Sequence, residues 1–284
     1  MKKILIIGSK GMAGHMLYTY LKEESDFEVI DIARGEDFFV PNYQIDVTNF
    51  KSLKDVLDKA NPDVVINCIG VLNNDAETNP DKAILLNCYL PHFLAKAGDE
   101  NKFKLIHIST DCVFNGKTGG YLESSFKDGI GFYAQTKALG EVLSHKHLTF
   151  RTSIIGPELK ENGIGLFNWF MHQKNKIQGF TQAFWTGVTT LELAKAVKAA
   201  ILQDLTGLHH LVNEEKINKF DLLNLLKLTF NKDILIESND NYKVDKSLIK
   251  TNHNFNYTVP SYEKMLEDSK NWIILHRHLY KYKF

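Results

Sequence analysis

The first half of the chain alternates apolar runs with segments of helical spacing. Runs rich in Val and Ile at residues 3–7, 28–32, 63–68, 104–109 and 148–153 are typical of strands buried on both faces of a sheet. A weaker run at residues 43–47 predicts a further strand. Between these strands, helices are predicted at residues 12–22, 53–60, 80–97 and 133–143. The alternation predicts an α/β fold with a doubly wound parallel sheet.

The predicted helices carry recognisable start signals. Asn49 or Ser52 is expected to cap the helix at 53–60, and Asn79 the helix at 80–97, where Pro80 takes the first helical position. After about residue 156 the alternation stops. Helices are predicted there at residues 166–172, 191–205, 220–229 and 262–278, with one strand at 209–212. This half of the chain is expected to form a smaller lobe, with elements that can cross back into the sheet.

Composition narrows the class of protein. The 284 residues include 34 Lys plus Arg and 34 Asp plus Glu, so the net charge is +0, and 44% of the residues are hydrophobic. Neither nucleic acid nor an anionic membrane surface is an expected partner, because both usually attract a basic excess. The apolar runs are too short to span a bilayer. Three widely spaced cysteines, Cys68, Cys88 and Cys112, indicate reduced thiols and a cytoplasmic location.

A glycine-rich loop lies directly between the first strand and the first helix. Gly8, Gly11 and Gly14, with Met12 among them, have the spacing that lets the backbone approach a pyrophosphate at a helix N-terminus. We therefore predict a Rossmann-type dinucleotide-binding domain over residues 1–155 and a mainly substrate-binding lobe over residues 156–284. Arg34, 20 residues after Gly14, would pair with a 2′-phosphate. It favours NADP(H), whereas Asp31 within the second strand leaves NAD(H) open.

Tyr and Lys occur four residues apart at three places, Tyr18/Lys22, Tyr133/Lys137 and Tyr242/Lys246. About one such pair is expected by chance, so the spacing alone decides nothing. Only Tyr133 begins a helix that follows a sheet strand ending in hydroxyls, at Ser109 and Thr110. A ligand binds beyond the carboxyl ends of such strands, so Thr110 and Tyr133 are expected to converge on one carbonyl oxygen. Lys137 is expected to lower the pKa of Tyr133 and make its phenol a proton donor.

These motifs resemble a known superfamily. The glycine loop, Asp46-Val47, Asn67-Cys68-Ile69-Gly70, Ser109-Thr110-Asp111 and Tyr133-x-x-x-Lys137 occur in the order seen in extended short-chain dehydrogenases/reductases. Ser-Thr-Asp-Cys-Val-Phe-Asn-Gly from residue 109 and Arg-Thr-Ser-Ile from residue 151 are most similar to dTDP-4-dehydrorhamnose reductases. The resemblance covers roughly residues 2–205.

The resemblance implies a role for each matching position. Tyr133 protonates the substrate ketone, Lys137 binds the nicotinamide ribose and lowers the tyrosine pKa, and Thr110 holds the carbonyl. Substrate contacts are implied for Thr110, Asp111, Ile154 and Trp185. Cofactor contacts are implied for Gly8, Gly11, Met12, Gly14, Arg34, Asp46, Val47, Cys68, Ile69, Gly70, Asn87, Ser109, Tyr133 and Lys137.

Two positions depart from related families. Members with a bound magnesium carry a glutamate where this chain has His15, so no metal site is predicted. Sugar-nucleotide dehydratases have Thr-Asp-Glu where this chain has Thr110-Asp111-Cys112, and without that glutamate the elimination lacks its general base. Cys112 matches an epimerase cysteine of GDP-fucose synthases. The alternative is a cysteine that only fills core.

The resemblance thus predicts NADPH-dependent reduction of the 4-keto group of a nucleotide-activated deoxysugar, for cell-surface polysaccharide precursors. A bifunctional epimerase/reductase and a noncatalytic regulatory subunit with the same fold stay open as alternatives. The sugar, the nucleotide and the product stereochemistry depend on lobe residues such as Asn168, Trp169, Trp185 and Thr189, which either contact substrate or belong to the core. The oligomeric state is also open, with a homodimer as one option.

Overall fold

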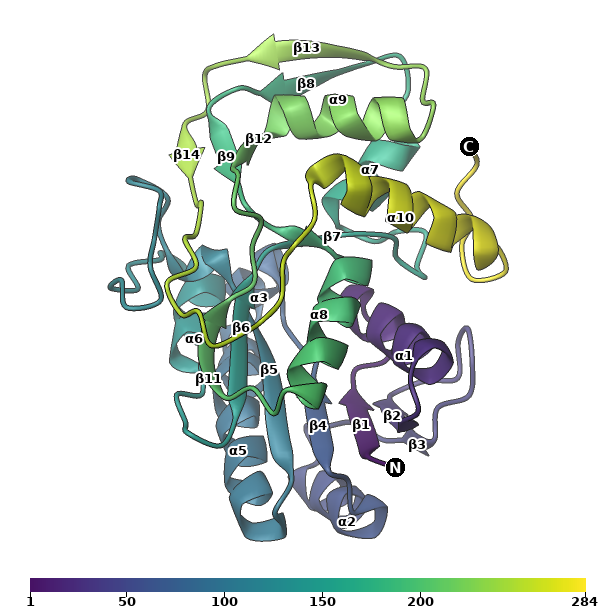
Figure 1. Ribbon diagram of the computed structural model, residues 1–284, viewed down its shortest axis with the longest axis vertical. Helices are drawn as coiled ribbons and strands as arrows, with labels where there is room; N and C mark the ends of the chain where they lie inside the picture. The colour runs from purple at the N-terminus through teal and green to yellow at the C-terminus, as the bar shows by residue number, and fades with distance from the viewer.

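The computed structural model describes all 284 residues and is built around a seven-stranded parallel sheet (Figure 1). The strand order is β11-β6-β5-β4-β1-β2-β3. The strands are β1 (Lys3–Ile7), β2 (Glu28–Ala33), β3 (Tyr43–Gln44), β4 (Val64–Asn67), β5 (Lys104–Thr110), β6 (Leu148–Thr152) and β11 (Gly207–His210). The chain starts at the centre and winds outward in both directions, so the order reverses between β1 and β4. The predicted doubly wound fold is confirmed.

Two hydrophobic cores cover the two faces of the sheet. Ile4 and Ile6 of β1 point into one core, and Leu5 and Ile7 into the other. This alternation explains why the strand is apolar at every position, since both faces are buried. Helices α1 (Met12–Glu24) and α8 (Thr190–Leu202) pack on the first face. Helices α2 (Phe50–Ala60), α5 (Leu90–Asn101) and α6 (Phe132–Leu139) cover the second.

The long helix predicted at residues 80–97 has a π-helical middle. It consists of α4 (Pro80–Ala83), the π segment η1 (Ile84–Tyr89) and α5. The end of α6 crosses η1 so closely that any side chain at Gly140 would overlap the Asn87 carbonyl oxygen. The Asn79 side chain does not cap this helix but donates to Asp75 in α3 (Asn73–Thr78), whereas Asn49 caps α2 as expected. A π segment of this kind is frequent at functional sites.

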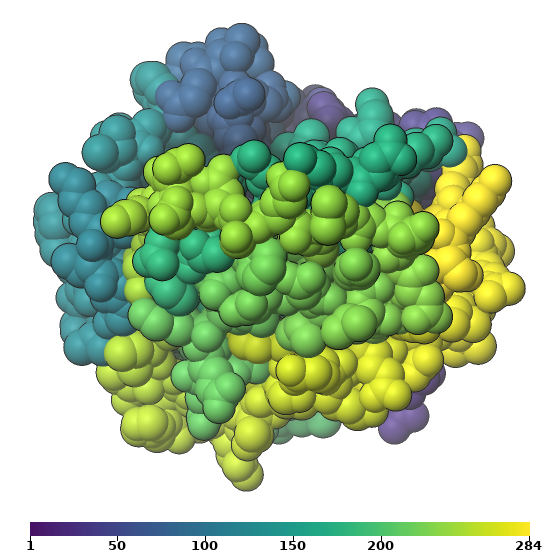
Figure 2. Space-filling view, turned by 90° about the horizontal axis from the view of Figure 1, so that it is seen from above, coloured from purple at the N-terminus to yellow at the C-terminus, as the bar shows by residue number.

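The C-terminal lobe sits over the carboxyl ends of the strands, and Figure 2 shows it from above, bordered by segments of the first half. It contains helices α7 (Leu166–His172), α9 (Lys219–Thr229) and α10 (Tyr262–Leu275). Its strands form small sheets, β7 (Ile154–Ile155) with β10 (Val188–Thr189), β8 (Lys176–Phe180) with β13 (Leu235–Asn239), and β9 (Ala183–Trp185) with β12 (Ile217–Asn218) and β14 (Val244–Asp245). Helix α8 and strand β11 return to the large sheet. No helix is both long and apolar enough to cross a membrane.

Several predicted boundaries were wrong. The strand expected at 43–47 is only β3, and the helix expected at 133–143 ends at Leu139. The strand expected at 209–212 is β11, two residues earlier, and the last helix ends at Leu275. The lobe strands other than β11 were missed because they have only two to five residues, too few to show a period.

Candidate functional site

The glycine loop joins β1 to α1 in a tight turn. Gly8 has φ +88°, and its N–H donates to the Ile32 carbonyl at 3.0 Å. A side chain at Gly14 would overlap the Gly8 carbonyl oxygen, so only glycine lets α1 begin this close to the loop. No side chain caps the N-terminus of α1 at Gly11. Its first N–H groups are therefore directed toward the space beyond β1, as anion binding requires.

Asp31 and Arg34 differ in what they can bind. Asp31 is fully buried, and its carboxylate already accepts hydrogen bonds from Ser9 Oγ and Asn42 N. Arg34, after the end of β2, is 72% exposed and its Nη1 lies 3.9 Å from Asp46 Oδ2. Asp46 also accepts two bonds from Thr48, which with the nearby Arg34 hold its pKa below the usual value.

Two further residues belong to this end of the sheet. Val47, after Asp46, is buried in the second core. Lys10 of the glycine loop, which sequence reasoning missed, donates to the Gly35 carbonyl at 2.5 Å, and its ammonium lies 5.0 Å from the Phe39 ring centroid. Lys10 from the glycine loop therefore reaches the segment that directly follows Arg34.

Asn87 organises the wall formed by the segment after β4. Its Oδ1 accepts from Val71 N at 2.8 Å, and its Nδ2 donates to the Val71 carbonyl at 2.9 Å and to Thr136 Oγ1 at 3.1 Å. The side chain therefore ties the loop after Gly70 to α6. Both Nδ2 hydrogens are used within the protein, whereas Oδ1 keeps a second acceptor site, and the cofactor contact of Asn87 stays a prediction. Cys68 and Ile69 lie in the same wall, where the Ile69 side chain lies against Gly8.

Thr110 and Tyr133 come together at the carboxyl end of β5. Thr110 Oγ1 donates to Asp111 Oδ1 at 3.1 Å and accepts from Cys112 N at 3.1 Å, which opens the 3-10 turn η2 (Asp111–Val113). Tyr133, in the first turn of α6, has its backbone N–H directed at Glu77 Oε1. Thr110 also lies close enough to the Tyr133 phenol to act against the rise of its pKa. The two hydroxyl groups are therefore neighbours, and their convergence on one carbonyl oxygen stays a prediction.

Lys137 was expected to lower the pKa of Tyr133, but the structure does not show this effect. Burial raises the pKa of Tyr133, the neighbouring Cys112 adds to the rise, and Lys137 does not lower it. The Lys137 ammonium instead donates to the Ile108 carbonyl at 2.7 Å and lies 3.4 Å from His107 Nε2. Burial lowers the pKa of Lys137 to about 8. Burial thus favours the uncharged form of both groups, the protonated phenol of Tyr133 and the neutral amine of Lys137.

Two lysines from the C-terminal lobe face the Thr110–Cys112 segment and were missed by sequence reasoning. Lys219, at the start of α9, lies 4.8 Å from the Trp185 ring centroid, and burial lowers its pKa to about 8 although Asp111 attracts its charge. Lys246 also lies near Asp111 and Cys112, and its charge acts to lower the pKa of both groups. Both lysines are far from Cys112 in the sequence, so only the fold brings a cation near this thiol. Burial and Asp111 nevertheless raise the pKa of the Cys112 thiol to about 11.

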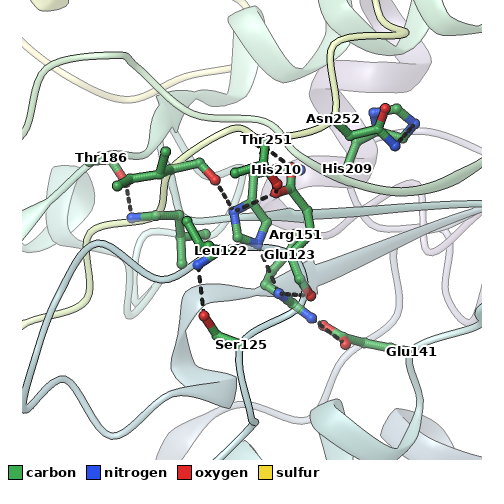
Figure 3. Close-up of polar contacts among 12 residues, drawn as sticks. Leu122, Glu123, Ser125, Glu141, Arg151, Thr186, His209, His210, Thr251 and Asn252 are labelled. Atoms are coloured by element: carbon green, nitrogen blue, oxygen red, sulfur yellow. Dashed lines mark hydrogen bonds and ion pairs between the residues drawn. The ribbon is translucent and has the colours of Figure 1, made fainter.

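A buried polar network lies behind this edge of the sheet (Figure 3). Arg151 of β6 binds Glu141 through two bonds of 2.8 Å and donates to His210 Nε2 of β11 at 2.8 Å. His210 Nδ1 donates to the Ile249 carbonyl at 2.8 Å, so the ring is neutral, and burial lowers its pKa to about 4. Glu123 joins the network by accepting from His210 N. The network fixes the 121–125 and 248–252 segments to the sheet.

Ser109 belongs to this network and not to the open side of the sheet. Its hydroxyl is buried and donates to Glu141 Oε1 at 2.7 Å. The cofactor contact expected of Ser109 stays a prediction.

The lobe residues predicted to decide substrate specificity differ in burial and in hydrogen bonding. Trp185 is 4% exposed and packs near Tyr262, with ring centroids 5.8 Å apart. Asn168 is buried and bonded to the Glu161 and Gly163 carbonyls. Thr189 caps α8. Ile154 and Trp169 are only partly buried, with Trp169 40% exposed. Asn168 and Thr189 thus have structural partners, and the substrate contacts of Ile154 and Trp185 stay predictions.

His15 takes a structural role in α1. It is buried, its Nδ1 lies 2.9 Å from the Gly11 carbonyl and its Nε2 3.0 Å from the Tyr280 hydroxyl. Burial lowers its pKa to about 4, so the ring is neutral. It connects the glycine loop to the C-terminal segment. No three His, Cys, Asp or Glu side chains gather in a group that could hold a metal ion.

Comparison with known proteins identifies similar sequences. The family model described as RmlD substrate binding domain matches residues 1–234. A probable low-salt glycan biosynthesis reductase, Agl14, of Haloferax volcanii is 32% identical over 139 residues, covering 48% of this chain and 46% of that protein. A dTDP-4-dehydrorhamnose reductase of Shigella flexneri is 30% identical over 221 residues, covering 74% and 72%. The match to the first of these relatives thus spans about half of its length.

Solved structures share the fold over nearly the whole chain. A hypothetical dTDP-4-dehydrorhamnose reductase of Sulfolobus tokodaii has a TM-score of 0.77 at 25% identity, with 92% of this chain and 98% of that chain covered. A dTDP-4-dehydrorhamnose reductase of Bacillus anthracis, solved in complex with NADP, has a TM-score of 0.80 at 23% identity, with 96% and 99% covered.

Proposed function

Because the chain belongs to the RmlD substrate-binding domain family, we propose that it is an NADPH-dependent reductase of the 4-keto group of a nucleotide-activated deoxysugar. The observation that carries this proposal is the meeting of Thr110 and Tyr133 beyond β5, at the same edge of the sheet as the glycine loop. A phenol and a hydroxyl directed at one point suit a ketone oxygen that gains a proton as it is reduced. Polysaccharide precursor synthesis is the pathway we infer for this activity.

The residues present fit a dinucleotide phosphate. The uncapped N-terminus of α1 and the glycines that bring it close to β1 suit the pyrophosphate. The exposed Arg34 guanidinium, with Lys10 nearby, suits a 2′-phosphate, whereas the carboxylate of Asp31 is fully buried and bonded to Ser9 and Asn42. This balance favours NADP(H) over NAD(H). When bound, NADPH supplies the hydride, and the chain's own residues supply the proton and hold the substrate.

The lysines of the lobe support an anionic substrate. Lys219 and Lys246 direct two positive charges at the Thr110–Cys112 segment from the opposite side of the cleft. A nucleotide sugar carries a diphosphate close to the sugar, and it can bind both lysines while the 4-keto group reaches Thr110 and Tyr133. Residues 156–284 would on this view mainly bind substrate. The three unpaired cysteines support the cytoplasmic location inferred from the sequence.

The reaction assigns one task to each side chain. Thr110 donates to the ketone oxygen and keeps the carbonyl facing Tyr133. Tyr133 gives its proton to the oxygen that becomes the hydroxyl. Its raised pKa keeps the phenol protonated until that moment. A noncatalytic subunit would have no use for this arrangement, and an epimerase would need a base that Cys112, with its raised pKa, supplies poorly.

Replacing Tyr133 tests the proposal. Tyr133→Phe should keep NADPH binding, measured by fluorescence titration, and lose at least about a hundredfold in turnover of dTDP-4-keto sugars, the scale of a lost general acid. Tyr242→Phe is the matched control, because Tyr242 is 52% exposed in the lobe and begins the same four-residue spacing to a lysine. Near-normal turnover by Tyr133→Phe would reject the mechanism. Absence of turnover by the wild-type chain across a panel of nucleotide 4-keto sugars would reject the function.

A further inference from the structure

His107 and Asn67 lie directly behind Lys137, and the sequence motifs assign no role to their side chains. They are neighbours across strands β5 and β4, and both are fully buried. Asn67 Nδ2 lies 3.3 Å from His107 Nδ1, and His107 Nε2 lies 3.4 Å from Lys137 Nζ. A continuous polar chain therefore runs from the wall of the cofactor cleft to the lysine.

The backbone N–H of Ile69 sets the direction of this chain. It donates to Asn67 Oδ1 at 3.1 Å, so the other amide atom, Nδ2, faces the imidazole and donates to Nδ1. A neutral imidazole carries one N–H, so the proton of His107 sits on Nε2 and points at Lys137. Burial and the charge of Lys137 hold the pKa of His107 well below its usual value, so the ring stays neutral.

Lys137 therefore faces a hydrogen-bond donor. A neutral amine accepts the His107 Nε2–H bond with its lone pair and still donates to the Ile108 carbonyl. An ammonium has no lone pair, so its N–H groups would face the His107 Nε2–H with no acceptor between them. Reversing the chain would require the Asn67 amide to turn over and give up its bond to Ile69. The arrangement is fully satisfied only when Lys137 is neutral.

We propose that His107, oriented by Asn67, is the positioning residue that stabilises the neutral amine of Lys137. Its use in the reaction rests on the function proposed above. After Tyr133 has protonated the ketone, the Lys137 ammonium returns a proton to the tyrosinate and becomes the neutral amine that His107 stabilises. Lys137 then takes up a proton from solvent, which restores the starting state and balances the cycle.

The other charged or titratable groups around Lys137 either raise its pKa or do not act on its amine. Glu141, after α6, and Cys68, after β4, both raise its pKa, while burial lowers it. Tyr133 is one turn away on the same helix, and His92 of α5 acts on His107. Besides burial, the His107 chain is the feature that favours the neutral amine.

The pKa of Lys137 can be measured without cofactor or substrate. Protein labelled with ¹³C at the lysine ε carbons gives one signal per lysine, and Lys137→Met identifies that of Lys137. In Asn67→Ala the His107 ring can take the tautomer whose Nε2 is unprotonated, and this nitrogen can accept a bond from the Lys137 ammonium. The Lys137 pKa should therefore rise by roughly 0.5–1 unit, the equivalent of one hydrogen bond. His107→Leu, which removes the donor, should raise it similarly. An unchanged pKa in both variants would overturn the proposal.

His147→Leu is the matched control. His147 is also buried, and its Nδ1 accepts from Leu105 N at 3.0 Å, but it does not contact Lys137. It should destabilise the protein and leave the Lys137 pKa in place. If it raised that pKa as far as His107→Leu, the effect would be one of general loosening and the proposal would be wrong.

The wild-type protein offers a test that no folding defect can obscure. Above the pKa of Lys137, the ¹⁵N spectrum of the histidine rings should show His107 as the Nε2–H tautomer, and an Nδ1–H tautomer there would refute the chain of bonds. In turnover, the loss of activity at high pH should move upward in Asn67→Ala. Failure of all turnover would reject the function, while the NMR results would still decide the role of His107.

Discussion

Removing Arg151 should destabilise the protein strongly at neutral pH. The Glu141 side chain is 0% exposed and receives two bonds from Arg151 (Figure 3). Arg151→Met keeps the apolar stem volume but leaves that carboxylate with only Ser109 and the partly exposed Lys127, which lies 3.1 Å away. Breaking a buried ion pair costs about 3–5 kcal/mol. Since Lys127 still compensates part of the charge, we expect a loss near the lower end, about 3 kcal/mol.

The pH dependence of the loss identifies its cause. In the wild type, burial opposes the charge of Glu141, but the bonds and charge of Arg151 outweigh it and hold the pKa of that carboxyl below its usual value. That contribution to stability is present above the unfolded-state pKa and disappears as the pH falls. Without Arg151, burial should raise the folded-state pKa above the unfolded value. The penalty is then full at high pH and fades as the carboxyl takes up a proton.

Urea unfolding followed by tryptophan fluorescence, at about pH 7.5 and about pH 5, measures both effects. The deficit of Arg151→Met should be about 3 kcal/mol at the higher pH and clearly smaller at the lower one. The double variant Arg151→Met/Glu141→Gln should be more stable than Arg151→Met, because no buried charge is left alone. A deficit below about 1 kcal/mol at neutral pH, or one that grows on acidification, would refute the reasoning.

Two further predictions concern the cofactor and Cys112. Arg34→Ala should weaken NADPH binding by about 1–2 kcal/mol, which is below the full value of a charge-assisted bond because Arg34 is 72% exposed. NADH binding, measured in the same fluorescence titration, should stay almost unchanged. Equal losses of affinity for NADPH and NADH would show that Arg34 has a structural role. Cys112→Ser should keep most of the activity, and reduction in deuterated water should place no deuterium beside the ketone, since burial raises the pKa of the thiol to about 11. Deuterium that appears with the wild type and vanishes with Cys112→Ser would establish epimerisation.

The sequence by itself determined the features that depend on neighbours along the chain. Strands β1, β4 and β5 are buried on both faces of the sheet, and this burial requires apolar side chains at consecutive positions, which the sequence shows directly. The glycine spacing predicts the tight turn before α1, because only local backbone geometry decides it. The hydroxyls that end β5 and the Tyr133 helix were also readable, since a strand and the next helix in a doubly wound sheet must meet at one edge.

Features that depend on residues far apart in the chain could not be predicted from the sequence. Lys246 lies near Cys112, and Ser109 and Arg151 both bind Glu141, through contacts that no local period encodes. The pKa of Tyr133 is raised, opposite to the expected direction, because burial is a property of the whole fold that the lysine one turn away does not reveal. His107 reads in the sequence as one more polar residue in a strand. It becomes a partner of Lys137 because packing places α6 against β5, and because the Ile69 N–H fixes which ring nitrogen carries the proton.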